Sequence, residues 1–166
     1  VVALEDGRVV RHGDAIEVLG DPSFTPAGAR EAGALLTARV AAHHTDGLTE
    51  LDAGGVPLFL PRLSRPEGTA VRLRIAAHEV ILSRARPEGL SALNILPGTV
   101  GDLRPGEGPG MLVALDTPAG RVLARITRRS ADAMGLAPGE PCHAIVKSVA
   151  VAPGDVGQPT PEVATP

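Results

Sequence analysis

The chain has 166 residues, a formal net charge of -3 at pH 7, and only two aromatic residues, Phe24 and Phe59. It therefore lacks both the positive field that draws proteins to nucleic acid and the aromatic platforms on which single strands stack, and we expect no nucleic-acid partner. Cys142 is the only cysteine, which excludes an intrachain disulfide and fits a reducing compartment. No apolar run approaches the roughly 18 residues of a membrane span, so we expect a cytoplasmic chain without membrane insertion.

The chain opens with the pattern of a β-hairpin followed by a helix. "VVAL" and "RVVRHG" read as strands around the Asp-Gly turn of "EDGR", and Asp14 is a good N-cap for "AIEVL". This opening resembles the last hairpin and helix of an ABC-transporter nucleotide-binding domain. We expect residues 1–28 to be a remnant of such a domain plus a linker, in a fragment of a longer protein, because the chain begins without Met. The chain contains no GxxxxGK[ST] phosphate-binding loop, so we expect no ATPase activity and place ATP only in the missing N-terminal domain.

The rest of the chain repeats itself. "LTELDAGGVPLFLPRL" parallels "LVALDTPAGRVLARI", and "EGTAVRLRIAAHEVILS" parallels "GEPCHAIVKSVAVA". Each copy offers four or five short strands separated by Asp-Gly, Pro-Ala-Gly or Pro-Gly turns. We predict an all-β fold of two tandem five-stranded OB-like barrels, the first unit over residues 29–88 and the second unit over residues 89–153. The Pro-rich tail, residues 154–166, is predicted to be disordered.

The second unit carries an insertion, "TRRSADAMGLAPG", which predicts one short helical segment. Ser130 is its expected cap, and Gly135 or Pro138 its expected end. A β-unit of this size buries only about 60% of its unfolded surface and is marginal alone. We therefore expect the two units to pair with each other and the chain to form a homodimer.

Three stretches of the second unit together resemble the Mop domain, a molybdenum-binding family of the TOBE type. They are "SALNILPGTV" (91–100), "LVALDTPAG", and "VLARITRRSADAMGLAPGEPCHAIVKSVAV" (122–151). With the opening and the first unit, the chain resembles the C-terminal regulatory region of the ATP-binding subunit of a molybdate ABC importer. The resemblance implies binding of molybdate or tungstate, two oxyanions of nearly equal size and charge. It also implies homodimerisation, feedback inhibition of transport, and association with membrane permease subunits at the inner membrane through the missing ATPase domain.

A tetrahedral dianion needs several converging hydrogen-bond donors and one or two positive charges. Backbone N–H groups in turns serve well because they lose no side-chain entropy. Ser91 offers a hydroxyl at the start of a turn, and Lys147 and Ser148 offer a charge and a hydroxyl side by side. Neighbouring strand residues face opposite ways, so both can reach one ligand only at a strand end or bulge.

The resemblance implies an oxyanion-binding set in which Asn94 fixes the turn and Thr127 approaches from the partner subunit. The full set is Ser91, Ala92, Leu93, Asn94, Thr127, Lys147 and Ser148. The family often shows Ser-Ala-Arg-Asn, whereas Leu93 occupies the third position here. If the family's arginine acts through its side chain, the site is weakened; if the position contributes its backbone N–H, leucine is harmless.

Two alternatives remain beside the importer hypothesis. One is a free-standing cytoplasmic molybdate-storage protein built of two such units, against which the ABC-like opening argues. The other is a structural dimerisation domain with a decayed anion site, which Leu93 makes conceivable. His43 and His44 lie in no metal-binding spacing, so we expect no metal and no tightly bound cofactor.

Overall fold

A computed structural model describes residues 2–5, 8–13, 32–106, 108–151 and 156–157. The strands β1 (Val2–Glu5) and β2 (Arg8–His12) pair antiparallel, which confirms the predicted hairpin. The helix predicted over residues 15–19 lies outside the described residues. Within the described part of the chain, no helix is long and apolar enough to cross a membrane.

One five-stranded sheet, the first-unit sheet, has the strand order β12-β6-β3-β4-β5. Its members are β3 (Gly33–His43), β4 (Leu48–Ala53), β5 (Val56–Pro61), β6 (Ala70–Ala76) and β12 (Val156–Gly157), and a 3-10 turn η1 (Ala77–Glu79) follows β6. Along most of β3 every second residue is buried, because successive side chains of a strand point to opposite faces of the sheet.

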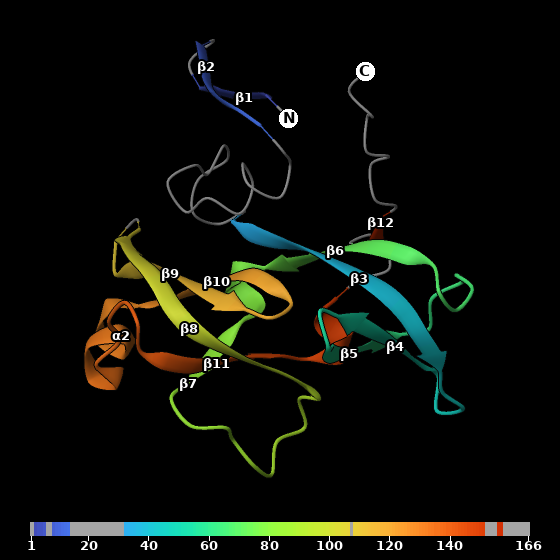
Figure 1. Cartoon of the computed structure of the whole chain (residues 1–166). Helices are drawn as coiled ribbons and strands as arrows, with labels where there is room; N and C mark the ends of the chain where they lie inside the picture. The colour runs from blue at the N-terminus through green and yellow to red at the C-terminus, as the bar shows by residue number, and fades with distance from the viewer. Residues whose placement is uncertain (1, 6–7, 14–31, 107, 152–155, 158–166) are drawn as a thin grey trace.

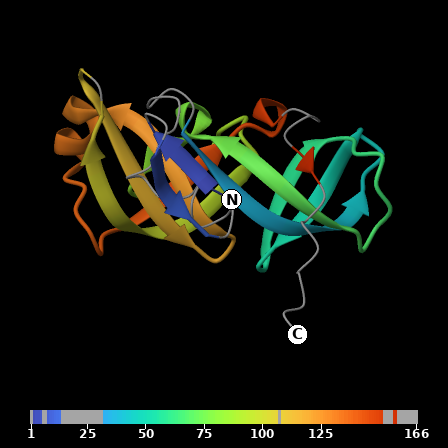
Figure 2. The same cartoon turned by 90° about the horizontal axis from the view of Figure 1, so that it is seen from above.

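The other five-stranded sheet, the second-unit sheet, has the order β10-β9-β8-β11-β7. Its members are β7 (Ile81–Ser83), β8 (Asn94–Pro105), β9 (Gly110–Thr117), β10 (Gly120–Thr127) and β11 (Pro141–Val146). A second 3-10 turn, η2 (Ser148–Ala150), follows β11. The two sheets lie side by side (Figures 1 and 2), which confirms the predicted all-β fold of two five-stranded, OB-like units.

The two units exchange strands reciprocally. The strand β7 follows η1 of the first unit but pairs with β11, with Leu82 opposite Ala144. The strand β12 follows the second unit but pairs with β6, with Val156 opposite Leu73. The sheets therefore do not divide at the boundary predicted after residue 88, because each unit completes the sheet of the other.

The strand β12 also corrects the predicted tail. Val156 and Gly157 were expected to be disordered, yet they form a strand against β6. The pairing is possible because β6 would otherwise leave a row of unpaired backbone groups at the edge of its sheet. The rest of the predicted tail lies outside the described residues.

One hydrophobic core runs through both units. Its cluster includes Leu36 and Leu73 from the first-unit sheet and Leu96 and Val113 from the second-unit sheet. Cys142 lies in the same core with no exposed surface. A shared core suits two units that are each too small to bury enough surface alone.

The insertion of the second unit forms a helix, α2 (Arg128–Met134), at one end of the molecule (Figure 1). Its N-cap is Thr127 and not the predicted Ser130: the Thr127 Oγ1 atom accepts a hydrogen bond from the Ser130 N–H at 3.1 Å. Ser130 sits three residues into the helix, where its own N–H needs such an acceptor. Gly135 ends the helix in the left-handed conformation, with φ 59°, as predicted.

Candidate functional site

A pocket of about 330 Å³ lies where η1 of the first unit meets two segments of the second-unit sheet, the loop before β8 and the end of β11. It is lined by His78, Glu79, Ile81, Leu90, Ser91, Ala92, Ile145 and Lys147. The loop of residues 84–93, which hangs below β7 and β11 in Figure 1, brings Ser91 and Ala92 to this pocket. The fold therefore brings together three of the predicted site residues, Ser91, Ala92 and Lys147, from segments far apart in the sequence.

Lys147 is the only lysine in the chain. The strand β11 ends at Val146, and Lys147 follows as the N-cap of η2 with an extended backbone. Lys147 therefore lies just beyond a strand end, the kind of position expected from the sequence for a ligand-binding residue. The ammonium is exposed and presents three rotatable donors as a compact charge, which suits a tetrahedral anion.

Ser148 lies in a different environment from its neighbour Lys147. Its side chain is buried and does not line the pocket beside Lys147. Its Oγ atom has no hydrogen-bond partner within the part of the chain that the structure describes. Buried hydroxyls in proteins are normally hydrogen-bonded, and one left without a partner costs about 1–3 kcal/mol.

Asn94 links the two units by hydrogen bonds and does not line the pocket. Its Oδ1 atom accepts a hydrogen bond from the Phe59 N–H at 2.7 Å, and its Nδ2 atom donates to the Phe59 carbonyl at 3.0 Å. The side chain is 2% exposed, and it ties the start of β8 to β5, the edge strand of the first-unit sheet. Leu93, next to it, is half exposed and lies outside the pocket lining.

Thr127 lies in a different pocket of about 310 Å³, with His78, Pro109, Gly110, Arg125 and Ile126. Its hydroxyl is also 2.8 Å from the Ser130 Oγ atom, so within one chain it serves the helix cap. Within one chain, Thr127 and Lys147 therefore lie in different pockets, and His78 lines both. The contact of Thr127 with an oxyanion bound in a partner subunit stays a prediction.

Two ionisable residues of the pocket, His78 and Glu79, were missed by the sequence reasoning. They come from the first unit, and the Nε2 atom of His78 lies 3.4 Å from the Glu79 Oε1 atom. The available signal was the parallel between the two copies, which sets "IAAHEV" (75–80) against "VKSVAV" (146–151). That parallel indicates that the turn after β6 has the same form as the turn carrying Lys147.

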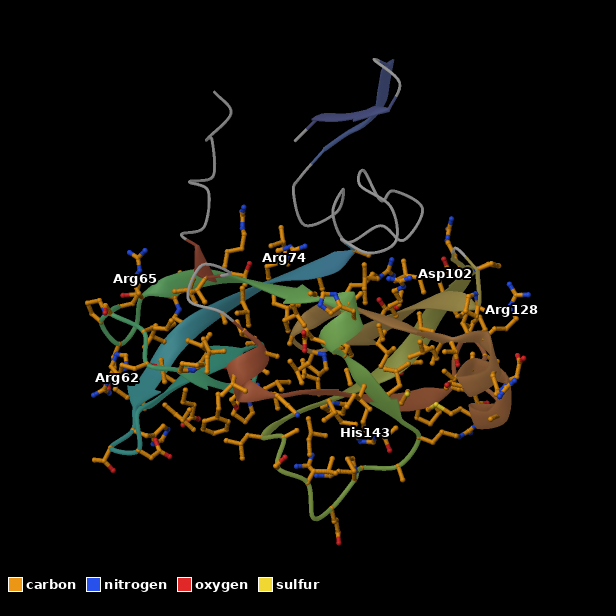
Figure 3. The ribbon with its side chains drawn as sticks, turned by 180° about the vertical axis from the view of Figure 1, so that it is seen from behind. Arg62, Arg65, Arg74, Asp102, Arg128 and His143 are labelled. Atoms are coloured by element: carbon orange, nitrogen blue, oxygen red, sulfur yellow. The ribbon has the colours of Figure 1, made fainter. Side chains whose placement is uncertain are left out.

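The other histidine pair has ordinary structural partners. The His43 ring contacts the Thr49 hydroxyl at 2.9 Å and the Arg65 carbonyl at 2.8 Å, whereas His44 lies 2.9 Å from the Glu50 carboxylate. Across the described ranges, no group of three or more His, Cys, Asp or Glu side chains is placed to hold a metal ion. Exposed arginines lie at both outer ends of the molecule, Arg62 at one and Arg128 at the other (Figure 3).

Comparison with known proteins identifies a family whose pattern matches the second unit. Residues 90–153 match the TOBE domain. The chain is 42% identical over 153 residues to the molybdenum import ATP-binding protein ModC of Rhizobium meliloti (strain 1021), covering 91% of this chain and 43% of that protein. It is 40% identical over 163 residues to ModC of Mesorhizobium japonicum, covering 97% of this chain and 44% of that protein. The chain thus spans less than half the length of these relatives.

A solved structure supports the same assignment. The cytoplasmic molybdate-binding protein ModG, in a crystal form with molybdate bound, superposes with a TM-score of 0.64 and 25% sequence identity. The match covers 75% of this chain and 95% of ModG. Residues 90–153 therefore match the TOBE domain, and the chain's resemblance to the TOBE-containing region of molybdate importer ATP-binding subunits is confirmed.

Proposed function

We propose that this chain is the oxyanion-binding regulatory region of a molybdate importer's ATP-binding subunit. The observation that carries the proposal is the meeting of Ser91, Ala92 and Lys147 in one pocket between the two units. The similarity to ModC, and to ModG in its molybdate-bound form, gives the ligand class. Tungstate is included because it has nearly the same size and charge.

The chemistry of the pocket suits a dianion held by one charge and several neutral donors. The Lys147 ammonium supplies the charge, and the Ser91 hydroxyl and backbone N–H groups of the loop supply further donors. Leu93 is compatible with this arrangement because its side chain lies outside the lining. This favours a backbone role for that position in oxyanion binding.

The proposal extends to the parent protein. The ModC relatives are more than twice as long as this chain, so ATP would be bound by a domain that this sequence does not include. The parent would sit on the cytoplasmic side of the inner membrane and contact the permease subunits of the importer. Because the relatives are ATP-binding subunits, a free-standing storage protein is not favoured. Oxyanion bound here would inhibit ATP-driven transport through coupling between the two sites.

A homodimer is the proposed assembly. Large apolar side chains are exposed near the pocket, including Ile81 and Leu90 in its lining and Leu93 beside Asn94. Val149, which follows Ser148, is 77% exposed. A partner chain that covered these residues would also close the pocket over its ligand. Light scattering at micromolar concentration should give about twice the 16.9 kDa mass of one chain; a single-chain mass would contradict the proposal.

The decisive experiment is a titration of the purified chain with molybdate, with sulfate and phosphate as competing oxyanions. Lys147→Ala should weaken molybdate binding by more than about tenfold, the order expected when a charge-assisted contact is lost. Arg86→Ala is the matched control, because Arg86 is exposed and does not line the pocket. Unchanged affinity in Lys147→Ala would misplace the site, and no binding by the wild-type chain would favour a structural dimerisation domain.

The single lysine permits a second, independent readout. Lys147 carries the only side-chain amine of the chain, so mild acetylation modifies one internal position. Molybdate at saturating concentration should protect this amine, and sulfate at the same ionic strength should protect it less. Equal acetylation with and without molybdate would contradict direct contact between Lys147 and the ligand.

A further inference from the structure

We propose that His78, a residue of the first unit, belongs to the oxyanion site and makes its affinity for dianions rise as the pH falls. The inference rests on the proposed function and adds a regulating residue to the same site. His78 stands in the lining together with Ser91 and Lys147, although it lies in the other unit. The site is therefore complete only when both units contribute.

The fold holds His78 firmly at the pocket. Its neighbour Ala77 is buried, and the Ala77 N–H donates to the Ala32 carbonyl at 2.8 Å. Val80 is buried too, and from there the chain runs directly into β7, where Ile81 pairs with Ile145 of β11. The strand exchange thus anchors η1 from both sides, while the side chain of His78 stays 55% exposed.

The charges around His78 decide how the pocket meets an anion. Within the lining, Glu79 carries a negative charge and Lys147 a positive one, and Arg125 of β10 lines the neighbouring pocket together with His78. With a neutral imidazole, the negative charge of Glu79 offsets the positive charge of Lys147, which weakens the attraction of the lining for a dianion. With an imidazolium, the lining carries a net positive charge. Histidine is the side chain that ordinarily makes this change between about pH 5 and 8.

Glu79 would otherwise oppose the ligand. A carboxylate in an anion pocket repels a dianion, yet the Glu79 Oε1 atom lies 3.4 Å from the His78 Nε2 atom. A protonated His78 would neutralise this carboxylate and present a further donor to the pocket. With a neutral imidazole the His78–Glu79 pair carries the negative charge of the carboxylate and repels the dianion. With an imidazolium the pair carries no net charge and offers the dianion a hydrogen-bond donor.

The second unit shows that the turn itself does not require this pair. The turns η1 and η2 begin after residues of the same backbone conformation. Ala76 before η1 has φ -71° and ψ 134°, and Lys147 before η2 has φ -68° and ψ 139°. In η2 the positions equivalent to His78 and Glu79 are Val149 and Ala150. The same backbone thus tolerates uncharged residues, and the charged pair stands only on the turn that faces Lys147.

The test is equilibrium dialysis of the full chain with micromolar molybdate at about pH 6 and about pH 8. The wild-type chain should bind about three- to tenfold more tightly at the lower pH, the size expected for a partly exposed charge acting on a dianion. His78→Gln should lose most of this increase. His44→Gln is the matched control, because His44 also pairs with a glutamate but lies outside the pocket, and it should keep the increase.

Glu79→Gln provides a second variant that does not depend on the first. It removes the repelling carboxylate and should tighten binding at about pH 8, the higher of the two pH values. Circular dichroism checks that each variant is folded. If His78→Gln does not fold, unchanged affinity in Glu79→Gln at the higher pH would by itself overturn the inference.

The failures of the two proposals are distinguishable. A wild-type chain that binds molybdate equally at both pH values, or a His78→Gln variant with the full wild-type increase, would overturn the role of His78 alone. A wild-type chain that binds no molybdate at either pH would overturn the proposed function, and the inference with it. Sulfate, also a dianion throughout this range, should show the same dependence on pH if it binds.

Discussion

Replacing Asn94 with alanine should destabilise the chain more than it weakens oxyanion binding. The side chain makes two hydrogen bonds to the backbone of Phe59, at 2.7 and 3.0 Å, and is almost fully buried. A net hydrogen bond contributes about 1 kcal/mol, and a buried backbone group left unpaired costs about 1–3 kcal/mol. Phe59 is only partly buried, so water can reach its freed groups in part. We expect a loss of about 2–4 kcal/mol in the free energy of unfolding.

The location of the two bonds explains why they matter. The strand β5 is at the edge of the first-unit sheet, where backbone groups lack a neighbouring strand. Asn94 supplies one acceptor and one donor to Phe59, as a paired strand residue would. Its removal frees part of that edge and loosens β8 of the second unit from the first unit in one step.

Urea denaturation followed by circular dichroism measures the loss. Leu93→Ala is the control, because this neighbouring side chain is half exposed and its truncation should change stability by about 0.5 kcal/mol or less. A loss below about 0.5 kcal/mol in Asn94→Ala would refute the bracing role. If the variant instead kept its stability and lost tenfold in molybdate affinity, Asn94 would be a ligand residue.

Three further outcomes are expected. Gly54→Ala should lower thermal stability by at least about 2 kcal/mol more than Gly55→Ala: both glycines have positive φ, but only at Gly54 would a Cβ atom meet the Pro118 carbonyl oxygen, at 2.2 Å. Equal losses would refute this close approach. Burial raises the pKa of the Cys142 thiol above its ordinary value of 9.0, so its contribution to stability is intact below that value and is lost as the pH rises through the raised pKa; Cys142→Ala should flatten the alkaline fall in denaturation midpoints, and an unaltered slope would contradict this. Leu93→Arg should leave molybdate affinity unchanged at low and high salt if this position acts through its backbone, whereas a tenfold tightening that high salt removes would show a side-chain role.

Much of the fold could be predicted because local signals agreed with one another. The two copies, their turn residues and the alternation along their strands all indicated short antiparallel strands. The strand exchange could not be predicted in the same way. The strand β7 has three residues, and nothing in Ile81, Leu82 and Ser83 distinguishes pairing with one sheet from pairing with the other. The choice is made by the shared core, which is a property of the whole chain.

The site was predictable to the extent that its residues belong to one motif. Of the residues that line the candidate pocket, Ser91 and Lys147 were predicted from the motif, whereas His78 was missed because it comes from the first unit. Thr127 illustrates a different difficulty: one hydroxyl can serve a helix cap and a ligand, and within this chain it serves the cap. Sequence patterns identify residue types suited to a role, but competition among local partners decides which role each side chain takes.

The comparison of the two turns shows which of their residues the fold itself requires. Ala77 in η1 and Ser148 in η2 occupy equivalent buried positions after backbones of the same conformation. Alanine fills the position without a polar atom, whereas the Ser148 hydroxyl is buried and has no partner among the described residues. Among the described residues, the fold therefore gives this hydroxyl no hydrogen-bonding role. Lys147 occupies the position that Ala76 has in the first unit. The second unit, which carries the proposed oxyanion site, therefore has a charged residue and a hydroxyl where the first unit has two alanines.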